Sequence, residues 1–229
     1  MNYFAHALPH LDRPYFLAGT ALPDWLSVID RKLRLRPRLL EPHRESENAD
    51  VRELVAGIAQ HLEDDGWFHV TRGFVETSAE IGLLFRTRLQ GSDGFRCGFL
   101  GHIVTELLMD AALIERNPRL LETYYRQLDS VDPQTVAAAV ETIAGRAAHR
   151  LTEFVTLFLR ERILWDYQTD EDLLRRLNQV LRRVTLSPLP AEAAGWLSVA
   201  RVRVVERLPE LLPREHYRLE LGAESLGLA

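Results

Sequence analysis

The stretch from Phe99 to Ile114 limits the possible folds more than any other part of the sequence. Its apolar residues surround the whole circumference of the helix that they predict, and a helix of this kind is buried. His102, Glu106 and Asp110 interrupt it at intervals of four, and four residues return a side chain to nearly the same helix face. A buried helix is therefore expected to carry one stripe of an imidazole and two carboxylates.

This buried stripe needs a source of positive charge. An unpaired carboxylate is costly to bury, and no lysine or arginine lies between Cys97 and Glu115. A bound metal ion would neutralise the stripe, so His102 and Glu106 are predicted metal ligands. Asp110 is predicted to orient a histidine ring from behind the ligands. A buried network of histidine and carboxylate hydrogen bonds, without metal, is the alternative.

A second stripe of possible ligands lies in a helix expected over residues 49–65 and just beyond it. His61, Asp65 and His69 recur every four residues, and they project onto the apolar face of that helix or its edge. Two such stripes on core-facing sides are more specific than one. The apolar face itself is formed by Val51, Leu54, Val55, Ile58 and Leu62.

The neighbours of this second stripe carry their own expectations. The same projection turns Glu63 and Asp64 towards water, so that Asp65 alone of three consecutive acids faces the core. Gly66 is expected to loosen the helix there, which places His69 less firmly than Asp65.

The pattern of the whole chain predicts an all-α fold, a single helical domain of about seven or eight helices. No run with a period of two residues indicates a strand. The helices near 49–65 and 96–115 are expected to pack side by side. Residues 31–50 are expected to form a surface loop. Further helices are expected over residues 67–89, 120–128, 132–165, 169–184 and 188–208, the fourth of these beginning with the capping residue Thr169.

One domain is expected to span residues 1–229. Within it, residues 1–115 are predicted to carry the metal site, residues 116–210 to complete the helical fold, and residues 211–229 to form a tail that no pattern assigns.

Several further polar residues could belong to a site. Asp24 follows Pro23 where a helical turn could begin, so it is either a site carboxylate or a helix cap. His149 and Glu153 also stand four apart, but they project away from the apolar stripe of their helix, which predicts a surface pair. Arg72 could reach a phosphate group, but we expect it to be solvated.

Composition excludes some classes of function. The formal net charge is −5 and the pI about 5.9, which argues against non-specific binding to nucleic acid. No signal peptide is expected at the N-terminus, and no transmembrane helix is expected because no apolar stretch approaches about 20 residues. A cytoplasmic protein is expected. Only Lys32 among the 28 basic residues is a lysine.

Three short motifs stand out in roughly residues 1–115. They are Met1-Asn-Tyr-Phe-Ala-His6, Gly19-Thr-Ala-Leu-Pro-Asp24 and Gly57-Ile-Ala-Gln-His61-Leu-Glu-Asp-Asp65. Together they resemble bacterial acyl-carrier-protein phosphodiesterase, a family similar to the helical HD-type metal phosphohydrolases. The order of possible ligands also resembles the zinc-dependent phospholipase C fold.

The resemblance implies a divalent metal held by His6, Asp24, His61 and Asp65. It further implies hydrolysis of a phosphodiester, with an acyl carrier protein or a lipid as the possible source of that group. This chain departs from the family at His69, where an acid is usual, and on the second helix, where the family has paired carboxylates. These departures predict a site richer in histidine, and neutral imidazole with carboxylate suits Zn, Mn or Fe.

The residues and the resemblance together favour a metal-dependent phosphoesterase. One or two divalent ions are expected to activate a water molecule, with Asp24 as a proton acceptor or a further ligand. The rival hypothesis is a helical binding or scaffold protein, in which the same side chains form a structural metal site or a polar network. Four residues are expected to converge in one cavity: His61, Asp65, His102 and Glu106. His6, Asp24 and His69 are expected close by, with Asp110 behind the ligands.

Overall fold

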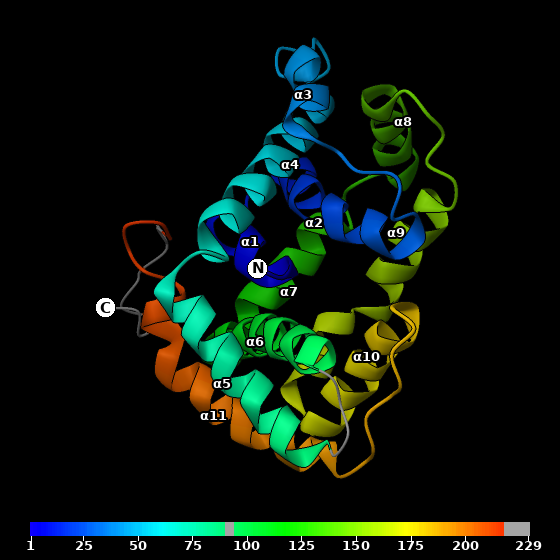
Figure 1. Cartoon of the computed structure of the whole chain (residues 1–229). Helices are drawn as coiled ribbons and strands as arrows, with labels where there is room; N and C mark the ends of the chain where they lie inside the picture. Colours follow the sequence, from blue (N-terminus) through cyan, green and yellow to red (C-terminus); the bar gives the residue numbers. More distant parts are fainter. Residues whose placement is uncertain (90–93, 218–229) are drawn as a thin grey trace. The chain divides into compact units, whose positions relative to one another are not determined.

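The structure is a computed structural model, and it describes residues 1–89 and 94–217 (Figure 1). Its described part contains helices and no strand, which confirms the predicted all-α fold. It has eleven α-helices in that part, more than the seven or eight expected, because several are short. Residues 218–229 of the predicted tail lie outside the described residues. The chain forms two compact units, and each unit is assembled from stretches that are separate in the sequence.

Unit 2 contains residues 3–66 and 118–162. Its central helix is α2, which packs against α1, α7 and α9, while α8 packs on both α9 and α3. Trp25 of α2 is fully buried and lies edge-on to Phe158 of α9, with ring centroids 5.2 Å apart. The elements are α1 (Tyr3–Ala7), η1 (Leu8–His10), α2 (Pro14–Ile29), α3 (Pro37–Leu40), η2 (Glu41–His43), α4 (Ala49–Phe68), α7 (Pro118–Leu128), α8 (Pro133–Ala144) and α9 (Leu151–Glu161). Of α4, the residues up to Gly66 belong to this unit.

Unit 1 contains residues 1–2, 67–117 and the described chain from Ile163 onward. Helices α5, α6 and α11 pack against one another, as Figure 1 shows, and the short helix η3 lies against α6 and α10. The predicted cap Thr169 is confirmed, because its hydroxyl accepts a hydrogen bond from the backbone N–H of Asp172. The elements are α5 (Arg72–Arg88), α6 (Gly94–Arg116), η3 (Ile163–Gln168), α10 (Asp170–Arg183) and α11 (Ala193–Leu211).

The predicted helix over 132–165 is wrong as one element, because it is two helices, α8 and α9. Asp132 caps the start of α8 as expected, accepting hydrogen bonds from two backbone N–H groups. Gly145 ends α8 with a φ of 65°, a left-handed conformation that costs glycine little. The apolar stripe hid this break, because its spacing continues across the interruption.

Two other boundaries also differ from the predictions. The expected surface loop over 31–50 contains the short helices α3 and η2, and Leu33, Leu35 and Leu40 in it are buried. The helix expected from residue 67 begins only at Arg72, because Thr71 caps it by accepting a hydrogen bond from the backbone N–H of Phe74.

Helix α6 is the buried apolar helix that the sequence predicts. By length and composition alone, its segment Arg96–Arg116 would be able to cross a membrane, which corrects the expectation that no apolar stretch is long enough. Of its most apolar window, 78% is buried inside the structure, as is common for a core helix. Asp110, with no exposed surface, lies within this helix.

Candidate metal centres

The predicted ligands gather into two groups of three, and each group lies within one unit. In each group, one nitrogen or oxygen atom per residue lies within 4.8 Å of the others. The His6 cluster, formed by His6, His61 and Asp65, belongs to unit 2. The Glu106 cluster, formed by His69, His102 and Glu106, belongs to unit 1. Both groups could hold a metal ion. The expectation that His61, Asp65, His102 and Glu106 share one cavity, and that α4 packs beside α6, stays a prediction.

A close contact between two helix backbones positions the His6 cluster. A Cβ atom built on Gly57 of α4 would lie 2.9 Å from the Cα of Gly19 and would collide with the carbonyl oxygen of Phe16 in α2. Only glycine allows the helices to approach so closely. One helical turn beyond this contact, the Nδ1 atom of His61 lies 2.8 Å from the carbonyl oxygen of Thr20.

The hydrogen bonds of both imidazoles leave the same nitrogen free for a metal. Nδ1 of His61 faces a carbonyl oxygen, which can only accept, so Nδ1 carries the proton. Nδ1 of His6 lies 2.9 Å from the Oδ2 atom of Asp64 and is likewise the donor when the carboxylate is ionised. Each ring can therefore keep a lone pair on Nε2, which is the arrangement that second-layer partners impose on metal-binding histidines.

The two Nε2 atoms face the carboxylate of Asp65. The Nε2 of His6 lies 3.5 Å from Oδ1, and that of His61 lies 3.4 Å from Oδ2. The rings are stacked, with centroids 4.1 Å apart. The Nε2 of His6 is buried and makes no hydrogen bond within the described structure. A buried, unsatisfied nitrogen beside a carboxylate is a fit for a cation at this point.

The charges in the His6 cluster favour bound cations. Burial disfavours the imidazolium of His61, yet the hydrogen bond and charge of Asp65, together with the charge of Asp24, raise its pKa above the ordinary value. Burial would raise the pKa of Asp65, but the imidazoles of His6 and His61 hold that pKa far below its usual range. Asp65 is therefore an anion at neutral pH, and a proton or a metal ion can balance it at the nitrogen of His61.

Asp64 corrects the helical projection, because it is buried and not turned towards water. It is 6% exposed, and it accepts hydrogen bonds from His6 and from the side chain of Gln60. The buried arc of α4 is wider than its apolar stripe because Gly57, His61 and Asp64 form its second half, and none of them gives a hydrophobic signal. Glu63 is exposed, as predicted.

We predict that Asp64→Ala weakens metal binding without removing a ligand. Loss of the acceptor frees the ring of His6 to rotate and to change tautomer, and partners of this kind contribute about 10–100-fold to metal affinity. Asp64→Asn keeps an acceptor oxygen and should lose less. Competition with a chelating dye would measure both affinities. Equal affinities of wild type and Asp64→Ala would contradict the assigned role.

The Glu106 cluster lies where the turn after α4 meets α6. His69 is the first residue after α4 and not part of the helix, which corrects its predicted place on a helical stripe, and α4 continues through Gly66 without a break. The Nε2 of His69 lies 2.9 Å from Oε1 of Glu106, and that of His102 lies 3.2 Å from the same oxygen. Phe74 contacts both imidazole rings, with centroids 5.0 Å away.

The cation that sequence reasoning failed to find beside Glu106 is the N-terminal amino group. The nitrogen of Met1 lies 3.1 Å from Oε1 of Glu106. Burial raises the pKa of Glu106, but this ammonium and the imidazoles of His102 and His69 hold the pKa well below its ordinary value. The buried carboxylate is thus already balanced in part by the protein, so the need for a metal is weaker here than at Asp65.

Of the remaining predicted residues, Asp24 and Asp110 lie within helices, and the others lie on the surface. Asp24 lies inside α2, which runs through Pro23, so it does not cap a helix; its charge acts on His61. Asp110 is fully buried in α6, and its predicted role behind a histidine stays a prediction. His149 and Glu153 are exposed and belong to neither cluster, as expected. Arg72 is exposed and pairs with Glu76 four residues on.

Comparison with known proteins gives no match for this chain: no family model, no curated protein and no solved structure resembles it closely enough. The function of the two clusters is therefore inferred from their geometry alone.

Proposed function

We propose that the protein is a metal-dependent hydrolase that cleaves a phosphodiester at the His6 cluster. One observation carries the proposal: the rings of His6 and His61 are held by Thr20 and Asp64 so that both Nε2 atoms face Asp65. Two imidazoles and one carboxylate form a set of three protein ligands, which leaves coordination positions open for water and substrate. An open set of this kind is typical of catalytic centres.

The ligand types favour Zn, Mn or Fe, with one ion at the His6 cluster. The Glu106 cluster has the same composition and is the candidate for a second ion. Its histidine side chains are 30% and 45% exposed, against 0% and 4% in the His6 cluster. The more buried cluster suits electrostatic catalysis better, because charges act more strongly where water is excluded.

A divalent ion held there would lower the pKa of a bound water and neutralise phosphate oxygens. With such an ion bound, the oxygen of a water molecule would add to phosphorus as one ester bond breaks, which would yield an alcohol and a phosphomonoester. Asp24 would accept the water proton, which would then pass to the departing alkoxide. Thr20 and Asp64 keep the rings oriented. A phosphopantetheine arm or a lipid headgroup, the groups implied by the family resemblance, would supply such an ester.

Elemental analysis joined to a phosphodiesterase assay tests this function. Purified protein should hold a transition metal in near-stoichiometric amount, and it should hydrolyse bis(p-nitrophenyl) phosphate in a chelator-sensitive way. His149→Ala, a histidine change on the exposed surface, should keep both metal and activity. Protein that binds metal but hydrolyses no phosphodiester would refute the enzymatic proposal and leave the metal site standing.

Acidity should affect the metal-free and the metal-loaded protein in opposite directions. The folded pKa of His61 lies above its ordinary value of 6.5, so its stabilising charge is fully present below that value and is lost as pH rises through the folded pKa. The metal-free protein should therefore lose stability as the pH rises above about 6.5. Metal requires neutral His61, so its stabilising effect should grow over the same range.

Melting temperatures with excess EDTA and with excess Zn or Mn would measure the two slopes. Saturation at about 100 times the dissociation constant is expected to add about 2.7 kcal/mol to the free energy of unfolding. Parallel slopes with and without metal would show that the ion does not compete with the proton on His61.

A non-catalytic role has its own support at the Glu106 cluster. Three nitrogens, from Met1, His69 and His102, approach a single oxygen of Glu106. This network satisfies the carboxylate without a metal, so a structural or binding protein is the second candidate. Metal retained by His61→Ala but lost from His102→Ala would favour it.

A further inference from the structure

A basic cavity in unit 2 forms a site that the proposed hydrolase does not use. The cavity is about 480 Å³, which lies in the usual range for small-molecule pockets. Among the described residues, those that line it include six cations and no acid. The cations are Arg31, Lys32, Arg34, Arg36, Arg38 and Arg146.

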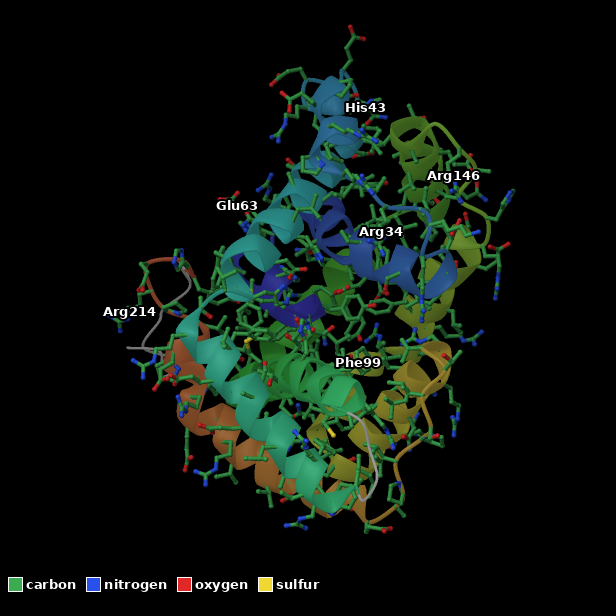
Figure 2. All side chains as sticks on the ribbon, viewed as in Figure 1. Arg34, His43, Glu63, Phe99, Arg146 and Arg214 are labelled. Carbon is green, nitrogen blue, oxygen red and sulfur yellow. The ribbon has the colours of Figure 1, made fainter. Side chains whose placement is uncertain are left out.

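The cavity is built by two stretches far apart in the sequence. Five cations follow α2 or lie in α3, and Arg146 follows α8; Arg34 and Arg146 are labelled in Figure 2. An ion pair between Arg146 and Asp30 ties the stretches together. Because α3 also packs against α8, these cations belong to folded structure and not to a tail.

Alternation along the extended stretch explains why the charges point outwards together. Leu33 and Leu35 are 4% and 5% exposed, whereas the basic residues on either side of each leucine are exposed. In extended chain, successive side chains point to opposite sides. The leucines anchor the stretch to unit 2, and the cations are left to face solvent.

Four of the cations that line this cavity lack a carboxylate partner among the described residues. Lys32, Arg34, Arg36 and Arg38 make no ion pair there, although the protein as a whole carries a net charge of −5. Gathering unpaired like charges destabilises the fold unless an anion binds. Arginine predominates, and its planar fork of donors matches phosphate oxygens in pairs.

We propose that this cavity binds a multiply phosphorylated group, either in a free metabolite or on a lipid headgroup. A bounded cavity favours a compact polyanion over nucleic acid, which needs a long basic stripe and which the acidic remainder of the protein would repel. No aromatic residue is among those that line the cavity, whereas aromatic anchors are typical of protein interfaces. The site is independent of the proposed metal chemistry.

Titration calorimetry with sodium tripolyphosphate tests the proposal on the full chain, in EDTA and about 0.15 M salt, where weak surface attraction is screened. We expect saturable binding of one molecule. Arg36→Ala with Arg38→Ala should weaken it at least about tenfold, since hydrogen bonds to charged groups contribute that much or more. Arg119→Ala with Arg126→Ala, two exposed arginines of α7, removes the same charge elsewhere and should change nothing.

Lys32 supplies a second readout. As the only lysine, it should be protected from an amine-reactive reagent when tripolyphosphate is bound, whereas inorganic phosphate should protect it poorly. Vesicles that contain phosphatidylinositol bisphosphate distinguish the two sources: cosedimentation indicates a headgroup, and its absence beside binding of tripolyphosphate indicates a free metabolite.

Four outcomes would overturn the proposal. One is a lack of saturable tripolyphosphate binding. Another is equal weakening in the two double variants, which would indicate a general charge effect. The third is tighter binding of a short single-stranded RNA than of tripolyphosphate. The fourth is binding to vesicles that carry only phosphatidylserine that equals the binding to vesicles with phosphatidylinositol bisphosphate.

Discussion

Asp65→Ala is expected to strip the His6 cluster of metal and to abolish hydrolysis together with it. Both Nε2 atoms face the carboxylate of Asp65, at 3.5 and 3.4 Å. Mutation of a residue that only hydrogen-bonds to a metal ligand already reduces metal affinity about 10–100-fold. Loss of the ligand itself should therefore reduce the affinity by more than the upper end of that range. Its removal also leaves two buried imidazoles without the anion that balances a cation between them.

Glu63→Ala is the matched control, because Glu63 lies on the same helix two residues earlier and is exposed (labelled in Figure 2). It removes the same charge from α4 and should leave metal content and activity unchanged. Metal content measured on both variants, with circular dichroism to verify the fold, separates a ligand from a nearby charge. Full metal occupancy in Asp65→Ala would end the claim that this cluster is the centre.

Gly57→Ala is expected to destabilise the protein by about 3 kcal/mol, the upper end of what an overfilled contact costs. The added methyl group would collide with the backbone of Phe16 and Gly19, which cannot rotate away as a side chain can. Helices α2 and α4 would have to separate, and the hydrogen bond from His61 to Thr20 would lengthen. Metal affinity should therefore fall along with the melting temperature.

Gly66→Ala provides a control of opposite sign on the same helix. An added Cβ at Gly66 meets no atom within 4 Å, and alanine is favoured over glycine in a helix by about 1 kcal/mol. Thermal melts of the two variants should thus move in opposite directions. A Gly57→Ala protein that melts like wild type would show that the close approach of the two helices is not needed.

Much of the fold could be predicted because its signals are local. The apolar circumference of α6 and the caps at Asp132 and Thr169 depend on neighbours in the sequence, and the structure has them as expected. The break between α8 and α9 could not be predicted from the spacing of apolar residues, because that spacing continues across the short interruption. There Gly145 was the available signal, and its left-handed conformation marks the end of α8.

The candidate site was harder to predict because its second layer is not local. A helical projection that counted only apolar residues predicted that Asp64 faces water. Asp64 is buried instead, three residues after His61 on the same side of α4. The ammonium of Met1 beside Glu106 had no signal in the neighbourhood of α6. A search for cations limited to nearby lysine and arginine cannot find a partner that lies more than a hundred residues away in the sequence.

The interleaving of the two units has a consequence for synthesis on the ribosome. Helix α6 emerges from the ribosome well before α11, against which it packs, and at ordinary translation rates the delay is of the order of ten seconds. During that time α6, which is long and apolar enough to cross a membrane, lacks part of the protein surface that buries it. A nascent chain that ends near residue 115 holds every predicted ligand yet completes neither unit, so it should depend on chaperones and bind metal poorly.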